Sequence, residues 1–249
     1  MKGIHKNKLG AVLEMKWRTL FSKNFIVMPL FSVGITFIMK LLYQTLAAKG
    51  GETMSNTLLA MALSLGATMN ISMTGILCTG MSLAEEKEKH TLRALMTSSV
   101  NGLEFFLGSI LPVVAMMVVV NILVTLVAGV RLTVSGWGLW LGVSLLCAIA
   151  SGVLGMILGI CAKDQMTAST VSTVPMLILV MIPNFRGFNP VLDKIGDFLF
   201  TGVLQNIIRD LVQRDSGVDL TGLVVILGEI LLAVLVFLYV YRKNGYDAG

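Results

Sequence analysis

Long apolar segments recur along this chain and constrain its fold more than any other feature. A membrane-spanning helix needs about 20 consecutive, mostly apolar residues. Six segments meet that requirement, and they cover residues 25–43, 58–83, 105–130, 137–161, 166–183 and 220–241. We therefore predict an all-α polytopic membrane protein with six transmembrane helices, which form a single transmembrane domain over residues 1–249.

The composition supports a lipid environment. Charged residues make up 13% of the chain and apolar residues 55%, whereas a soluble domain carries about 25% charged residues. The basic residues sit at the ends of the apolar segments and do not gather with aromatic residues on one face, so we expect no nucleic-acid partner. The three cysteines lack the spacing of metal ligands, and we expect neither a metal site nor a disulfide.

Lysine and arginine are biased toward one side of the predicted membrane. With the N-terminus inside, most of them lie in the N-terminal segment, in the loop after the second span and behind the last span. Cytoplasmic loops carry an excess of Lys and Arg. We therefore predict that both termini and the loop over residues 85–104 are cytoplasmic.

Two further segments are amphipathic at helical spacing. Residues 8–22 place apolar side chains on one face with basic side chains around it, which predicts a helix at the inner membrane interface against anionic lipid headgroups. Topology-setting charge is the alternative interpretation of residues 8–22.

Residues 191–214 carry an apolar face, formed by Phe200, Val203, Leu204, Ile207, Ile208 and Leu211. That face predicts outer helical structure, either as a lid over the bundle or dipping into the outer leaflet.

A short charged segment stands between the second and third spans. Glu85 and Lys89 are spaced for an i, i+4 ion pair. An apolar ridge follows, formed by Leu92, Leu95 and Met96. We predict a coupling helix over residues 85–98, with its acidic residues in the first turn, where the helix dipole favours negative charge. Such a ridge fits a groove on a partner protein, and an ordinary solvated loop is the alternative.

This loop resembles the signature of ATP-binding-cassette (ABC) type-2 exporter permeases. The resemblance rests on the run Glu86-x-Glu88-x-x-Thr91-Leu92-x-x-Leu95-x-Thr97-Ser98-x-Val100-x-x-x-Glu104-x-x-x-Gly108. In that family the motif covers the cytoplasmic end of the second span, a coupling helix and the start of the third span. The layout of six spans, inner termini, an N-terminal interfacial helix and small outer helices is also similar to the family.

The resemblance implies a dimer in a bacterial cytoplasmic membrane, formed with a second copy of this chain or a related permease. It also implies that a separate cytoplasmic ATPase subunit docks on the coupling helix. The implied contacts are Glu85, Glu86, Glu88, Thr91, Leu92, Leu95, Met96, Thr97 and Ser98. The chain has no Gly-rich phosphate loop, so we expect no cofactor on it and expect ATP and Mg²⁺ to bind the partner subunit.

Polar and small side chains within the spans are candidates for a translocation path or for helix packing. A stripe along the second span consists of Ser64, Thr68, Ser72 and Thr79, and either interpretation fits it. Glu229 is an acidic residue deep within the last span, where a charge must face protein or water. It either fixes the packing of that span or binds a cationic substrate. Close helix packing is predicted at Gly138, Gly142, Gly155 and Gly159.

Together these features favour an exporter permease that is not itself an enzyme. We expect contact with membrane lipid and an amphipathic substrate, foremost a peptide such as a toxin, a bacteriocin or an antimicrobial peptide. Small hydrophobic drugs, a lipid-linked glycan and an ATP-independent carrier are the alternatives. A carrier would need more intramembrane charges than Glu229, and an intramembrane enzyme would need a His/Asp/Glu or Ser/Lys constellation, which the spans lack.

Overall fold

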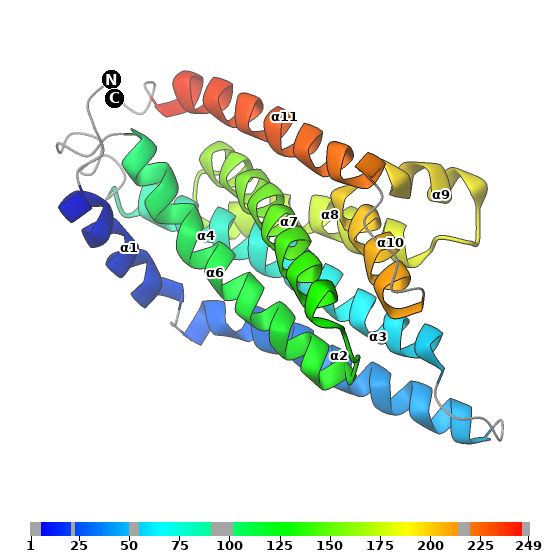
Figure 1. Cartoon of the computed structure of the whole chain (residues 1–249). Coiled ribbons are helices and arrows are strands. Elements are labelled where there is room, and N and C mark those ends of the chain that lie inside the picture. The colour runs from blue at the N-terminus through cyan, green and yellow to red at the C-terminus, as the bar shows by residue number, and fades with distance from the viewer. Residues whose placement is uncertain (1–5, 21–22, 50–54, 91–101, 214–219, 246–249) are drawn as a thin grey trace.

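The chain is a bundle of helices in the computed structural model (Figure 1). The structure describes residues 6–20, 23–49, 55–90, 102–213 and 220–245, and within these it contains helices and no strands. The elements are α1 (Lys6–Leu20), α2 (Lys23–Lys49), α3 (Asn56–Met69), η1 (Asn70–Cys78), α4 (Thr79–Glu88), α6 (Gly102–Ala128), α7 (Val134–Cys161), α8 (Gln165–Asn184), α9 (Pro190–Asp197), α10 (Phe200–Gln213) and α11 (Leu220–Gly245).

Six helical units in the described part of the chain are long and apolar enough to cross a bilayer, which confirms the predicted all-α polytopic membrane protein. They are Phe25–Lys49, Asn56–Glu88, Phe105–Ala128, Val134–Cys161, Gln165–Asn184 and Leu220–Tyr241. The second span joins α3, η1 and α4 into one helix, and 78% of its apolar window is buried, against 17% for the last span. The second span therefore forms the centre of the bundle.

The middle of the second span is a π-helix, η1, nine residues long. In a π-helix each backbone N–H bonds to a carbonyl five residues back, and such segments are rare beyond a single turn and frequent at functional sites. A neighbouring helix supports this segment, because the Ser151 hydroxyl of α7 donates to the Ile71 carbonyl oxygen at 2.6 Å. The second span thus changes helix type where it is most deeply enclosed.

Glycine allows α7 to approach the second span closely. A Cβ atom added to Gly155 would lie 2.7 Å from the Gly75 carbonyl oxygen, and one added to Gly159 would lie 2.6 Å from the Gly80 carbonyl oxygen. A side chain at either position would therefore overlap the backbone of the second span. The packing role predicted for these two glycines has a direct structural basis.

The other two predicted packing glycines lie elsewhere on α7. Gly138 and Gly142 are exposed, and a Cβ atom at either would have no neighbour within 4 Å in the described residues. They lie near the start of α7 on a face that no described helix covers, so the packing predicted for them stays a prediction.

The segment predicted as outer helical structure forms two helices, α9 and α10, at the opposite end of the bundle from α1 (Figure 1). The predicted apolar face of α10 is buried, from Phe200 to Leu211. Arg186 holds this region together. Its guanidinium donates to the Gly202 carbonyl oxygen at 3.2 Å and to the Asn206 side chain at 2.9 Å, and it also pairs with Asp197.

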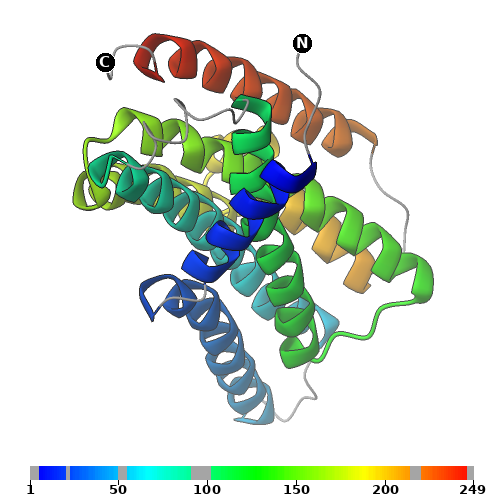
Figure 2. The same ribbon diagram turned by 90° about the vertical axis from the view of Figure 1, so that its left-hand side faces the viewer.

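At the other end, α1 crosses α6 on the surface of the bundle (Figure 2). Within the predicted interfacial segment 8–22, α1 extends to Leu20, and residues 21 and 22 lie outside the described residues. Gly108 of α6, the last residue of the quoted motif, makes room for this crossing. A Cβ atom there would lie 2.5 Å from Val12 Cγ1.

Candidate functional site

The last turns of α4 carry the acidic residues of the predicted coupling segment. Glu85, Glu86 and Glu88 continue the second span without a break, and α4 ends at Glu88. The prediction that they open a separate helix is therefore wrong. No glycine, proline or capping residue separates them from Leu83, so the sequence holds no stop signal there. The helix stops only before His90, whose φ of 57° is left-handed.

The apolar half of the predicted coupling helix lies outside the described residues. It comprises Thr91, Leu92, Leu95, Met96, Thr97 and Ser98. Their predicted contact with an ATPase subunit stays a prediction.

The position of the glutamates at a helix C-terminus changes their electrostatics. That end of a helix carries partial negative charge and disfavours carboxylates, so the side chains need other partners. Lys89 Nζ lies 2.5 Å from Glu85 Oε1, which raises the pKa of Lys89 through this hydrogen bond and charge. Glu88 Oε2 accepts a hydrogen bond at 3.2 Å from the backbone N–H of Gln165, the first residue of α8.

Glu86 has the most buried partner. Lys16 Nζ of α1 lies 2.8 Å from Glu86 Oε1, and only 4% of the Lys16 side chain and 13% of the Glu86 side chain are exposed. Lys16 also donates to Ser82 Oγ at 3.3 Å and lies over the Phe105 ring, 5.5 Å from its centroid. Burial lowers the pKa of Lys16, and the Glu86 carboxylate opposes that shift. A lysine expected among lipid headgroups is instead packed inside the protein.

Lys87 connects the same turn to α7. Its ammonium donates to the carbonyl oxygens of Ile160 at 2.9 Å and Ala162 at 3.1 Å, which satisfies acceptors that the C-terminus of α7 leaves open. Asp164 then caps α8 by accepting from the Thr167 N–H at 2.7 Å, and these hydrogen bonds lower the pKa of Asp164.

These contacts join four helices at one place. We name Lys16, Glu86, Lys87 and Glu88 the α1-end cluster, because together they tie the end of α4 to α1, α7 and α8. Sequence reasoning did not find Lys16 or Lys87. A signal for Lys16 exists, since it stands one helical turn from Val12 and one from Leu20, which are both buried.

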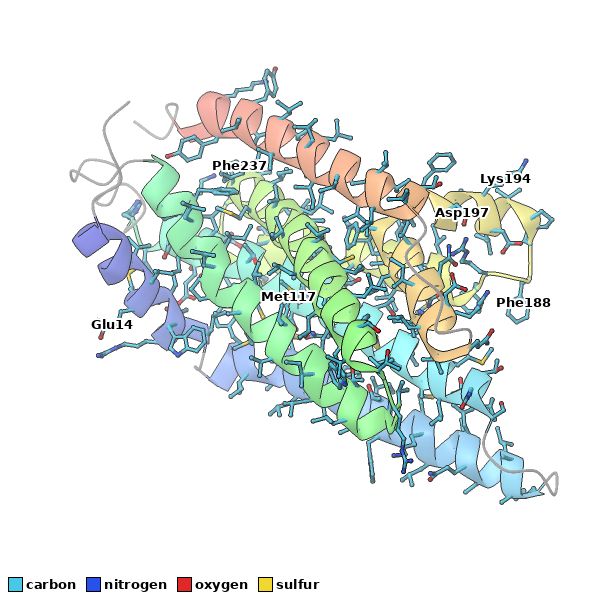
Figure 3. All side chains as sticks on the ribbon, in the orientation of Figure 1. Glu14, Met117, Phe188, Lys194, Asp197 and Phe237 are labelled. Carbon is cyan, nitrogen blue, oxygen red and sulfur yellow. The ribbon has the colours of Figure 1, made fainter. Side chains whose placement is uncertain are left out.

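A second polar cluster lies in the middle of the bundle, beside η1. The Asn70 amide donates to Asn121 Oδ1 at 2.8 Å and to the carbonyl oxygen of Met117 at 2.9 Å. The Asn121 amide in turn donates to Ser144 Oγ at 2.6 Å. Met117 is labelled in Figure 3 and is fully buried. The network links three spans, and Asn121 gave no sequence signal because it is a single polar residue in an apolar run.

A comparison with protein families gives the class of this bundle. Residues 41–241 match the family described as ABC-2 family transporter protein. The chain belongs to that family. It is therefore a multi-pass transmembrane subunit of an ABC-2 transporter and is not itself catalytic. A comparison with curated proteins finds no match.

In this ABC-2 transporter the candidate path residues lie in two different environments. Thr68, Ser72 and Thr79 are buried inside the bundle, whereas Ser64 borders a cavity of about 450 Å³ between α3, α8 and α10. Thr68 donates to the Ser64 carbonyl oxygen at 2.7 Å. The hydroxyls of Ser72 and Thr79 have no hydrogen-bond partner among the described residues. Three of the four residues are thus enclosed by neighbouring helices, and both the packing role and the path role of the stripe stay predictions.

Glu229 of the ABC-2 transporter is used within the bundle. Its Oε2 accepts a hydrogen bond at 2.7 Å from the backbone N–H of Phe200, the first residue of α10. The N-terminus of a helix carries free N–H groups and favours negative charge. Glu229 thus caps α10 from α11. This contact is consistent with the predicted packing role, and both predicted roles, packing of the last span and binding of a cationic substrate, stay predictions. In the described residues, no group of three His, Cys, Asp or Glu side chains is placed to bind a metal ion.

Proposed function

We propose that this chain is the transmembrane subunit of an ATP-driven exporter, powered by a separate cytoplasmic ATPase subunit. In this proposal the α1 end of the bundle faces the cytoplasm, both termini lie there, and a bacterial cytoplasmic membrane holds the complex. The ATPase subunit binds ATP and Mg²⁺. A second copy of this chain, or a related permease, completes the transporter.

The α1-end cluster carries the proposal. Force applied to the segment after Glu88 reaches α4 directly, since that segment continues from the end of the second span. The buried Lys16–Glu86 pair and the Lys87 contacts then carry the force to α1 and α7. Because these contacts connect the docking point to several helices, a force applied there moves the helices together and does not merely bend one loop. This arrangement suits the transfer of work from an ATPase.

The π-helical segment supports transmission toward the other end. It separates α4, which is bonded to α1, from α3, which borders the cavity. Because helix segments with displaced hydrogen bonds are frequent at functional sites, we assign η1 the role of the deformable part of the second span. The Asn70–Asn121 contact holds it in the present arrangement.

The cargo in this proposal is an amphipathic molecule, foremost a peptide. Sixteen methionines among 249 residues supply flexible apolar side chains, which adapt to varied ligands. One carboxylate oxygen of Glu229 already accepts a hydrogen bond from Phe200, so the proposal assigns this residue to packing and not to a cationic cargo.

The decisive test is co-purification of an ATP-hydrolysing subunit with the full-length chain. Leu95→Asp is expected to abolish the co-eluting ATPase activity while membrane insertion is unchanged, because a charge disrupts an apolar contact. Met166→Asp is the matched control, since Met166 is 80% exposed at the start of α8, beside the Glu88 contact. If the Leu95→Asp protein retains the ATPase, the docking role is wrong.

Transport provides the second measurement. The purified complex in sealed vesicles is expected to move a fluorescent amphipathic peptide only with ATP and Mg²⁺. Equal transport without nucleotide would contradict the proposal and would favour an ATP-independent carrier.

A further inference from the structure

The cavity at the α10 end has the size of a small-molecule site. Its volume is about 450 Å³, within the range of roughly 300–1,000 Å³ that is typical of ligand pockets. The second span contributes three apolar side chains to its lining, Ala60, Met61 and Leu65, beside the hydroxyls of Thr57 and Ser64. The opposite wall is polar and comes from α8 and α10. A cavity lined by both apolar and polar side chains fits an amphipathic ligand.

The polar wall follows from the sequence of α10. Gln205, Arg209 and Gln213 stand at i, i+4 and i+8, so they share one helix face, and all three line the cavity. The apolar residues of α10 occupy the other side and pack into the bundle. Asn184 fixes one member of the row, because its Oδ1 accepts from Gln205 Nε2 at 3.1 Å. The Gln213 amide donates to Thr57 Oγ1 across the cavity at 3.3 Å.

The cavity is positively charged. Two arginines line it and no lining residue in the described chain is acidic. The guanidinium of Arg186 is occupied by Asp197 and Asn206. Arg209 is exposed and forms no ion pair with any residue that the structure describes. Asp210 follows it on α10 but is not part of the lining.

The geometry points to a binding site for an amphipathic anion in this cavity. A carboxylate or phosphate head binds Arg209, since guanidinium groups match the geometry of both anions, and Gln213 beside it supplies an amide donor. The apolar part of the ligand lies along Met61 and Leu65. If the ligand is the exported cargo, the cargo has a negatively charged head group. That part of the inference rests on the proposed export function. The same head chemistry belongs to the anionic phospholipids of the membrane.

Equilibrium binding to the full-length chain tests the site. The protein is placed in phosphatidylcholine nanodiscs and titrated with radiolabelled laurate or with dodecanol, its uncharged counterpart. Laurate is expected to bind about tenfold more tightly than dodecanol, because a hydrogen bond to a charged group contributes at least a factor of that order. Arg209→Gln is expected to reduce laurate affinity to that of dodecanol. Arg131→Gln, at an exposed arginine between α6 and α7, is the matched control and leaves both affinities unchanged.

A second variant separates charge from packing. Gln213→Glu keeps Arg209 but places a carboxylate one turn away, where it pairs with the guanidinium. This variant is expected to weaken laurate binding and to leave dodecanol binding unchanged. Equal wild-type affinities for the two probes, or undiminished laurate binding in both variants, would overturn the inference.

Lipid composition distinguishes the two sources of the anion. If phosphatidylglycerol in the nanodisc competes with laurate at the wild-type site but not in Arg209→Gln, the natural occupant is a membrane phospholipid. If it does not compete, phosphatidylglycerol is excluded as the occupant and an exported amphiphile remains. The assay contains neither ATPase nor nucleotide. A negative result in this binding assay would not affect the coupling tests described above. Negative results in the coupling tests would likewise not affect a measured anion-binding site.

Discussion

The two ends of the bundle differ in whether their charged side chains have partners within the protein. At the α1 end, Lys16 and Glu86 are buried against each other and Lys87 is bonded to two carbonyl oxygens of α7 and the turn after it. At the α10 end, Arg209 faces an open cavity with no ion-pair partner in the described residues. The outer faces of that end also expose Phe188 and Lys194 (Figure 3).

Under the proposed function, this difference separates two requirements of the subunit. A part that transmits force needs contacts that break only at high cost, and buried ion pairs have that property, because removing one partner leaves a charge without compensation. A part that receives and releases a ligand needs unfilled volume and an unsatisfied group. The substitutions that follow should therefore affect stability strongly at the α1 end and weakly at the α10 end.

The largest effect is expected from breaking the Lys16–Glu86 pair. Lys16→Ala removes the buried cation that lies 2.8 Å from the Glu86 carboxylate and should lower the free energy of unfolding by about 3–5 kcal/mol. Thermal denaturation in nanodiscs measures this. The double variant Lys16→Met, Glu86→Leu should recover most of the loss, since apolar pairs often replace buried ion pairs without penalty.

Arg18→Ala is the control for that pair. Arg18 and Glu14 form an exposed i, i+4 ion pair on the same helix, and exposed pairs contribute about 0.3–0.5 kcal/mol. If Arg18→Ala destabilises the protein as much as Lys16→Ala, burial is not the cause of the difference.

The next largest effect is expected from the glycines of α7. Gly159→Ala places a methyl group 2.6 Å from the Gly80 carbonyl oxygen and should lower stability by about 1–3 kcal/mol through overpacking. Gly142→Ala is the same change at the other end of the helix, where nothing lies within 4 Å, and it should leave the melting temperature unchanged or slightly raised. Equal losses in the two variants would contradict the packing described here.

A smaller effect is expected at Glu229. Glu229→Leu removes the acceptor for the Phe200 N–H and should lower stability by about 1–2 kcal/mol, the usual loss for a buried donor left without a partner. Hydrogen exchange of residues 200–204 locates the loss. Glu229→Gln keeps an acceptor oxygen, so its exchange rates should stay close to those of the wild type. Faster exchange in both variants would show that the charge itself is needed.

The smallest effect is expected from the cap of α8. The lowered pKa of Asp164 means that its carboxylate is stabilised in the folded state. This contribution is present above the unfolded-state pKa of about 3.9 and is lost as the pH falls through the lower folded-state value. The melting temperature of Asp164→Ala should therefore lie below that of the wild type at pH 6, and the difference should shrink toward pH 3. A constant difference would exclude the titration of Asp164 as its origin.

Much of the fold could be predicted because lipid imposes length and apolarity on each span. The apolar face of α10 was also readable, since its residues repeat at helical spacing. The end of the second span could not be predicted in the same way. A run of charged residues after an apolar segment usually indicates a loop, whereas here the glutamates continue the helix beyond its apolar part. The helix ends before His90, which has a left-handed backbone conformation. Glycine at such a position would have indicated a helix end in the sequence, but histidine does not.

The site was less predictable because its contacts join distant parts of the chain. Lys16 and Glu86 are 70 residues apart, and the cap that Glu229 provides reaches 29 residues back. Helical spacing identifies which face of a helix is buried, but it does not say which side chain on another helix covers it. The π-helix is also invisible in the sequence, since Asn70 to Cys78 has no composition that distinguishes it from an α-helix.

The length of the second span has a mechanical consequence. Its 33 residues measure about 50 Å at an α-helical rise of roughly 1.5 Å per residue, whereas the hydrocarbon core is about 30 Å thick. The π-helix lies near the midpoint, so in the proposed coupling the span acts as a lever with two arms of similar length. A tilt of about 10° around that fulcrum displaces each tip by about 4 Å for a rod of this length. Ser64 lies about 12 Å from that midpoint at the same rise per residue, so the tilt that moves Glu88 by about 4 Å would shift the helix beside Ser64 by about 2 Å.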